Sequence, residues 1–164
     1  MAGISGELTG ALVAKLRAPG DGINVRVGAI EQSDSGLKAL GIRSITALYA
    51  GVEISEKSGH AHYPLMLAYC DRMSNALKEK FRRFSGKAHL VVEVRHSEDR
   101  LELLDAGTQV YVDAVCALLD DSRGDWGGGA FYAGGYEVAY EPIVRGGKNF
   151  LQRAKVGFEV EISR

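Results

Sequence analysis

The chain has 164 residues, of which 46% are hydrophobic and 25% are charged, and its formal net charge is -1. This length and composition fit one globular domain with a buried core. The near-neutral charge argues against a general nucleic-acid binder, which normally carries a basic excess. No apolar run reaches the roughly 18 residues of a membrane span, and the N-terminus lacks the features of a secretory signal. We therefore expect synthesis in the cytoplasm.

The N-terminal third is predicted to hold one helix and two strands. Leucines spaced four apart predict a helix over residues 5–17. Apolar and polar residues alternate over 23–30, as in a strand with one buried face. The polar stretch 31–43 predicts a loop, and the β-branched and aromatic residues of 44–55 predict a second strand.

The middle of the chain predicts a helix, a strand and a second helix. Residues 63–84 carry apolar side chains at intervals of three and four, which predicts a helix. Residues 89–95 form an apolar strand, and 98–121 form a helix capped by Ser97. A group of cations would then lie at the end of the first of these helices, either favoured by its dipole or available to an acidic partner or DNA. These are Lys78, Lys80, Arg82, Arg83 and Lys87.

The last third predicts a glycine-rich loop over 124–135 and a long hairpin formed by residues 136–144 and 149–162. The closing strand alternates strictly, so that Phe158 should be buried while its neighbour Glu159 faces water. At about 3.4 Å per residue this strand is as long as a domain of this size is wide, about 40 Å. We predict one α+β domain over residues 1–164, with a mostly antiparallel sheet, helices packed on one face and a long C-terminal β-hairpin. Its helix–strand–helix–hairpin core is 63–164, and 1–62 form its N-terminal part.

No catalytic or cofactor-binding pattern emerges. His60 and His62 form an H-x-H pair, but a zinc site needs three or four converging ligands. The glycines around Lys148 precede a strand and not a helix, so they predict a hairpin turn and not a phosphate loop. Glu53 and Glu93 lie on two different predicted strands, but Arg95 stands where a strand-based nuclease would carry lysine. We expect no enzyme activity, no metal and no cofactor.

The remaining distinctive residues are two cysteines and the only tryptophan. Cys70 and Cys116 each fall in an apolar pattern of helical spacing, which predicts buried free thiols without a disulfide. Trp126 lies in the glycine-rich loop. It is either an interface anchor or a side chain that folds back over the open end of the sheet.

The order of elements also carries a resemblance to a known family. A strand over 89–95, a helix over 98–121, a loop and a hairpin that closes on the sequence AKVGFEVEIS resemble the tail-terminator, or tail-completion (neck), proteins of long-tailed bacteriophages. In that family a small α+β subunit forms a ring on the last disc of the tail tube and joins the tail to the neck. The family has no catalytic residues.

The resemblance implies a structural virion protein that assembles as a homo-oligomeric ring, a hexamer by expectation. Its neighbours would be the tail tube protein and a neck or connector protein, with DNA only as passing cargo and with no membrane. The hairpin and the glycine-rich loop would reach these neighbours through Trp126, Tyr136, Arg145, Lys148, Phe150 and Arg153. A head-closure or other neck protein remains an alternative, as does a non-viral α+β domain that binds a ligand or a protein.

Overall fold

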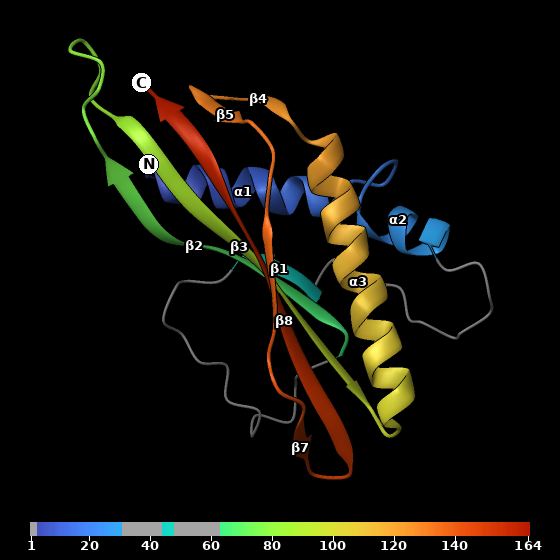
Figure 1. Ribbon diagram of the computed structural model, residues 1–164. Coiled ribbons are helices and arrows are strands. Elements are labelled where there is room, and N and C mark those ends of the chain that lie inside the picture. The colour runs from blue at the N-terminus through green and yellow to red at the C-terminus, as the bar shows by residue number, and fades with distance from the viewer. Residues whose placement is uncertain (1–2, 31–43, 48–62) are drawn as a thin grey trace.

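The computed structural model describes residues 3–30, 44–47 and 63–164 (Figure 1). Its helices are α1 (Ile4–Arg17), α2 (Ile23–Ile30) and α3 (Leu101–Asp121). Its strands are β1 (Ile45–Ala47), β2 (Leu65–Asn75), β3 (Ser85–Glu98), β4 (Gly124–Gly127), β5 (Ala130–Tyr132), β6 (Glu137–Tyr140), β7 (Val144–Gly146) and β8 (Asn149–Ser163).

The strands form one sheet in the order β1-β2-β3-β8-β5-β4, with β6 and β7 also paired to β8. The β1–β2 pair is parallel, and the other pairs are antiparallel. Together with the three helices in the described part of the chain, this confirms the α+β class, the mostly antiparallel sheet and the C-terminal hairpin.

One face of the sheet forms the hydrophobic core. Leu90 and Val92 of β3 lie opposite Phe158 and Val156 of β8, and all four side chains are buried. All three helices add buried residues to this same cluster, including Leu12 of α1. The strand residues in this cluster alternate along β3 and β8 and therefore lie on one face of the sheet. Because all three helices pack against these residues, they cover that single face, as predicted.

The 15-residue strand β8 organises the whole sheet. One of its edges pairs with β3 along almost its full length, from Ser163 opposite Ser85 to Phe150 opposite Glu98. Its other edge pairs in turn with β5, β6 and β7. At about 3.4 Å per residue β8 is roughly 50 Å long, which exceeds the roughly 40 Å width of a compact domain of this size.

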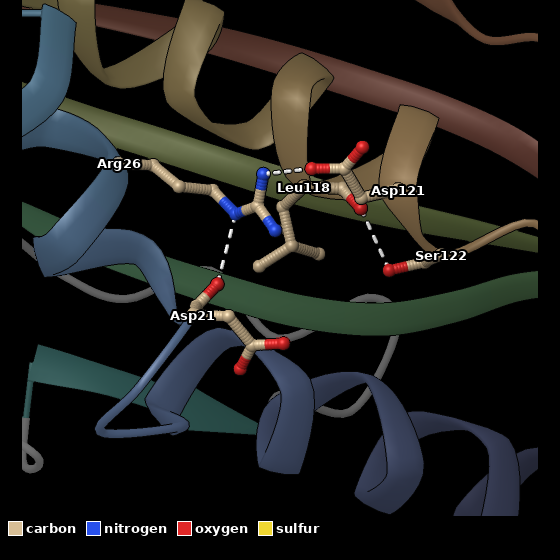
Figure 2. A network of polar contacts seen from close by, with 5 residues as sticks. All are labelled: Asp21, Arg26, Leu118, Asp121 and Ser122. Atoms are coloured by element: carbon tan, nitrogen blue, oxygen red, sulfur yellow. Dashed lines mark hydrogen bonds and ion pairs between the residues drawn. The ribbon is translucent and has the colours of Figure 1, made fainter.

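A polar clamp joins the N-terminal half of α2 to the C-terminal end of α3 (Figure 2). Arg26 donates from Nη1 to Oδ2 of Asp121 at 2.6 Å and from Nε to the backbone oxygen of Asp21 at 2.8 Å. Ser122 Oγ donates to the Leu118 carbonyl oxygen at 2.7 Å and thereby uses one of the last acceptors of the helix. The clamp fixes α2 against the end of α3.

The prediction of a strand over 23–30 is wrong, because this segment is α2. Only Ile23 and Val27 are buried on it, and they stand four residues apart on one helical face, whereas Val25 is 47% exposed. An alternating pattern always contains such pairs at i and i+4, so it did not exclude a helix. Packing against α3 overrides the strand preference of the β-branched side chains.

The prediction of a helix over 63–84 is also wrong, because these residues form β2 and the turn that leads into β3. The start of β2 is buried on both faces, with Met66 and Ala68 toward the helices and Leu65 and Leu67 on the opposite face. A β-bulge after Cys70 then shifts the register. Together these features remove the period of two that identifies a strand from sequence.

The other predicted elements differ mainly at their ends. The helix predicted over 5–17 begins at Ile4, and the strand predicted over 89–95 extends from 85 to 98. Ser97 therefore belongs to β3, and α3 begins only at Leu101 without a side-chain cap. The first strand of the predicted hairpin is divided into β6 and β7. Of the strand predicted over 44–55 the structure describes only 44–47, and the loop predicted over 31–43 lies outside the described residues.

Candidate assembly surfaces

The β7–β8 hairpin presents three of the six predicted interface residues at one end of the molecule. Its two-residue turn places Gly147 at φ 71°, a conformation that glycine adopts without strain. Arg145 and Lys148 are exposed, and the Arg145 guanidinium lies 5.7 Å from the centre of the Phe150 ring. This cation–π contact orders the arginine in a position that a neighbouring protein can reach.

The outer edge of β6 and β7 is apolar and open. Tyr136, Tyr140, Ile143 and Val144 are 39%, 48%, 38% and 47% exposed. In the described part of the chain β6 and β7 pair only with β8, so the other edge of each has no strand partner. An open strand edge with exposed apolar side chains is suited to association with another chain.

Trp126 folds back over the open end of the sheet, which is one of the two arrangements that the sequence left open. Its ring packs 5.8 Å from that of Tyr132 and 5.9 Å from that of Phe158, and its Nε1 donates to the backbone oxygen of Ser122 at 2.8 Å. Lys15 of α1 covers the ring at 5.1 Å. Trp126 thus closes the core at one end of β8, while β7 lies at the other end (Figure 1). The six predicted residues therefore do not form a single patch.

The sheet face opposite the helices carries a charged network around Glu93. Nε of Arg95 donates to Oε2 of Glu93 at 2.6 Å, and both residues are buried. Lys155 Nζ lies 3.7 Å from Glu93 Oε1 and 3.3 Å from Glu141 Oε1. The Glu93 carboxylate is thus engaged by two cations of the chain. Glu53, the other acid of the nuclease pattern, lies outside the described residues.

The turn between β2 and β3 carries the cations that the sequence placed at a helix end. Residues 77–83, here named the basic tip, hold Lys78, Lys80, Arg82 and Arg83 with only one carboxylate, Glu79. At its apex Phe81 is 100% exposed. A tip with this composition is positive and carries one protruding aromatic ring.

Several contacts hold the basic tip in place. Asn75 accepts from the Leu77 and Ser85 amides through Oδ1 and donates to the Arg83 carbonyl oxygen through Nδ2. Ser163 near the C-terminus donates to Glu79 Oε2 at 2.8 Å. The exposed ring of Phe81 thus projects from an ordered turn and not from a loose loop.

A cavity of about 450 Å³ lies beside the basic tip on the outer face of the sheet. Its lining includes Lys87 and His89, but also Glu159 and Glu161. Lys87 pairs with Glu159 at 3.1 Å, and His89 Nδ1 lies 2.5 Å from Asp71. The cavity is therefore lined by charges of both signs.

The exposed side of α3 is acidic. Between Leu101 and Asp121 the helix has five carboxylates and neither lysine nor arginine. We define the acidic stripe as the residues that follow one another along its exposed side at helical spacing. These are Asp105, Gln109, Asp113, Cys116 and Asp120.

Two tyrosines border the acidic stripe. Burial and the nearby carboxylate of Asp113 raise the pKa of Tyr140. The adjacent Cys116 thiol, followed by burial and Asp120, raises the pKa of Tyr136. The stripe and these two tyrosines therefore form one acidic and aromatic surface.

The two cysteines are free and half-buried. Cys70 lies on strand β2 and not on a helix, which corrects its predicted setting, whereas Cys116 lies on α3 as predicted. Burial raises the pKa of both thiols, so neither is an activated nucleophile. No group of three potential metal ligands occurs among residues 3–30, 44–47 and 63–164, and His60 and His62 lie outside these ranges. No described helix is long and apolar enough to cross a membrane.

The sequence analysis did not predict that the basic tip protrudes from the molecule. It also did not identify the acidic stripe, whose charge is opposite to that of the tip. The four cations near Phe81 were visible, but their assignment to a helix hid the turn that exposes them. The acids of α3 were visible as well, and their helical spacing could have identified the stripe. No model of a known protein family matches this chain, and a search of curated proteins finds no relative.

Proposed function

We propose that this chain is a structural ring subunit of the tail-terminator type, which joins the end of a phage tail tube to the neck. It acts through contacts with copies of itself, as a hexamer by expectation, and with the tube and neck proteins. It needs no cofactor and carries out no covalent chemistry. In this role it is part of the virion and reaches it from the host cytoplasm.

The observation that carries this proposal is the open edge of β6 and β7 with its row of exposed apolar side chains. In a monomer such an edge is an aggregation hazard, whereas a neighbouring subunit would cover it. Ring formation needs contact between two different surfaces of identical subunits. The projecting β7–β8 hairpin, with Arg145, Lys148 and Phe150, supports the proposal because it can reach a neighbour beside this edge.

The proposal is tested by the mass and shape of the purified protein. Sedimentation over a range of concentrations should reveal a closed oligomer of defined mass, and electron-microscopy class averages should reveal a ring. Replacing Arg145–Lys148 by a two-residue turn should preserve the circular dichroism spectrum and weaken assembly. A protein that stays monomeric at its concentration in particles and is absent from virions would contradict the proposal. Normal assembly after the replacement would remove only the part assigned to the hairpin.

A further inference from the structure

We propose that the basic tip of one subunit docks on the acidic stripe and the bordering tyrosines, Tyr136 and Tyr140, of the next subunit. This inference rests on the proposed ring and names two surfaces that meet in it. The occupant of the acidic surface is therefore a second copy of this chain.

The first argument is charge complementarity within one sequence. The tip has four cations and one carboxylate, and α3 has only acidic charges along its 21 residues. Among the described residues, ion pairs engage Asp121 and Asp120, with Arg26 and Arg123 respectively, but none engages Asp105 or Asp113. The stripe therefore offers to a neighbour Asp113 and also Asp105, whose Oδ2 accepts one hydrogen bond from Gln109 at 3.0 Å. Complementary charges of this kind steer two copies together and disfavour tip-to-tip contact.

The second argument is the match of apolar groups. Phe81 is completely exposed, so a partner that covers its ring would remove apolar area from water. The acidic surface offers Tyr140, which is 48% exposed, and Tyr136. An aromatic side chain that inserts among other aromatic rings, inside a border of charged groups, is a common arrangement at the centre of an interface.

The third argument is the position of the two surfaces. The β2–β3 turn and α3 lie on opposite sides of the molecule (Figure 1). A tip on one side and an acceptor on the other make a head-to-tail contact, which can close into a ring. The tip is ordered by Asn75 and by Ser163, so docking does not require a loop to fold first.

The tip alone is too small for a stable interface, which buries about 1,200–2,000 Å² in total. Its contact adds to the one made by the β6–β7 edge. It supplies register and specificity, and disruption should weaken assembly without unfolding the subunit.

The experiment uses the full-length chain and two interface variants. One combines Lys80→Ser with Phe81→Ser on the tip, and the other is Asp113→Lys on the stripe. Each should lower the association constant about tenfold or more in sedimentation experiments, with an unchanged circular dichroism spectrum. Lys80→Arg, which keeps the tip charge, and Glu161→Lys, which makes the same charge change on the outer face of β8, should assemble like the unaltered chain.

Mixing the two variants gives the decisive result. The tip variant keeps an intact stripe, and the stripe variant keeps an intact tip. In a mixed pair the intact tip can therefore dock on the intact stripe. A mixture should form one-to-one pairs that do not grow into rings, although each variant alone is monomeric at the same concentration. Raising the salt concentration should weaken these pairs, because solvent-exposed charges are screened.

The possible failures are distinct. If the unaltered chain forms rings and both variants assemble equally well, the docking contact is wrong and the ring stands. If the variants are defective but the mixture forms no pairs, the tip binds a surface other than the stripe and the inference fails. If the unaltered chain stays monomeric throughout and is absent from virions, the proposed function and this inference both fail.

Discussion

The two faces of the β3–β8 pair are built from alternate residues of the same two strands, yet they differ completely in chemistry. The face toward the helices places Leu90 opposite Phe158, among side chains that are almost fully buried. The opposite face carries ion pairs, with Lys155 near Glu93 and Lys87 near Glu159. Burial of apolar area stabilises the first face, whereas the contribution of the second depends on how far each ion pair is shielded from water.

The charged face is itself divided along its length. Glu93 and Arg95 are 4% and 5% exposed, whereas the side chains of Lys87 and Glu159 are 51% and 53% exposed. A buried charge depends on its partner far more than an exposed one does. Substitutions at three kinds of position can therefore test the comparison: the apolar face, the buried ion pair and the exposed ion pair.

The largest effect is expected for Phe158→Asp. This change places a carboxylate among the rings of Trp126 and Tyr132, at a cost of several kcal/mol that is comparable with the whole stability of a domain. Glu159→Lys, one residue away on the opposite face, should cost about 1 kcal/mol or less. Circular dichroism and thermal melting should find the first variant unfolded and the second folded. Two equally stable variants would contradict the division of the strand into two faces.

The second effect is expected at the buried ion pair. Arg95→Ala leaves the Glu93 carboxylate buried without its closest cation, which should cost about 3–5 kcal/mol in unfolding free energy. Replacing both residues, as in Glu93→Leu with Arg95→Leu, should recover much of this loss because no buried charge remains. Urea denaturation of the three proteins measures the effect. A double variant less stable than Arg95→Ala would mean that the pair itself stabilises the fold.

This difference between the faces also explains what the sequence could reveal. The one-sided strand β8 was predicted because its alternating residues meet opposite environments, with Val160 buried and Glu161 exposed. Helix α3 was predicted because its buried residues recur at helical spacing. Strand β2 was not predicted. Met66 is buried on one face and Leu67 on the other, and the bulge after Cys70 breaks the alternation.

The candidate site was predictable only in part, for the same reason. Arg145 and Lys148 lie on a hairpin that local sequence defines, and they are exposed as expected. The position of Trp126 depends on ring contacts with Tyr132 and with Phe158, which lies on a strand much later in the sequence. Local sequence patterns do not reveal such contacts. The basic tip became visible only once β2 was known to be a strand, since a helix would have spread its cations around an axis.

A third, smaller effect is expected in alkaline solution. Burial raises the pKa of Tyr132 from its ordinary value of 10 to about 12, so the folded protein holds this proton more tightly than the unfolded chain does. Its contribution to stability is therefore complete below pH 10 and is lost as the pH rises from about 10 to 12, by no more than about 2–3 kcal/mol. Tyr132→Phe should flatten the stability profile in this window.

The control for this prediction is the neutral range. There Tyr132→Phe should cost about 1 kcal/mol, because it removes the 2.9 Å hydrogen bond that the hydroxyl donates to the Gly135 carbonyl oxygen. Denaturation curves between pH 7 and pH 12 measure both effects. An equally steep alkaline loss in the variant would assign the titration to the other tyrosines with raised pKa values, Tyr69, Tyr136 and Tyr140.

The smallest effect is expected for the exposed pair of Lys87 and Glu159, whose Nζ and Oε2 atoms are 3.1 Å apart. A double-mutant cycle with Lys87→Met and Glu159→Gln should give a coupling energy of about 0.2–1 kcal/mol. This energy should fall toward zero in 1 M salt, where the screening length is about 3 Å. The same cycle at Glu93 and Arg95 should give a larger coupling that salt barely changes, since those atoms are shielded from solvent. Equal salt sensitivity of the two pairs would show that burial does not divide the charged face, and the expected difference in stability between its two ends would then have no physical basis.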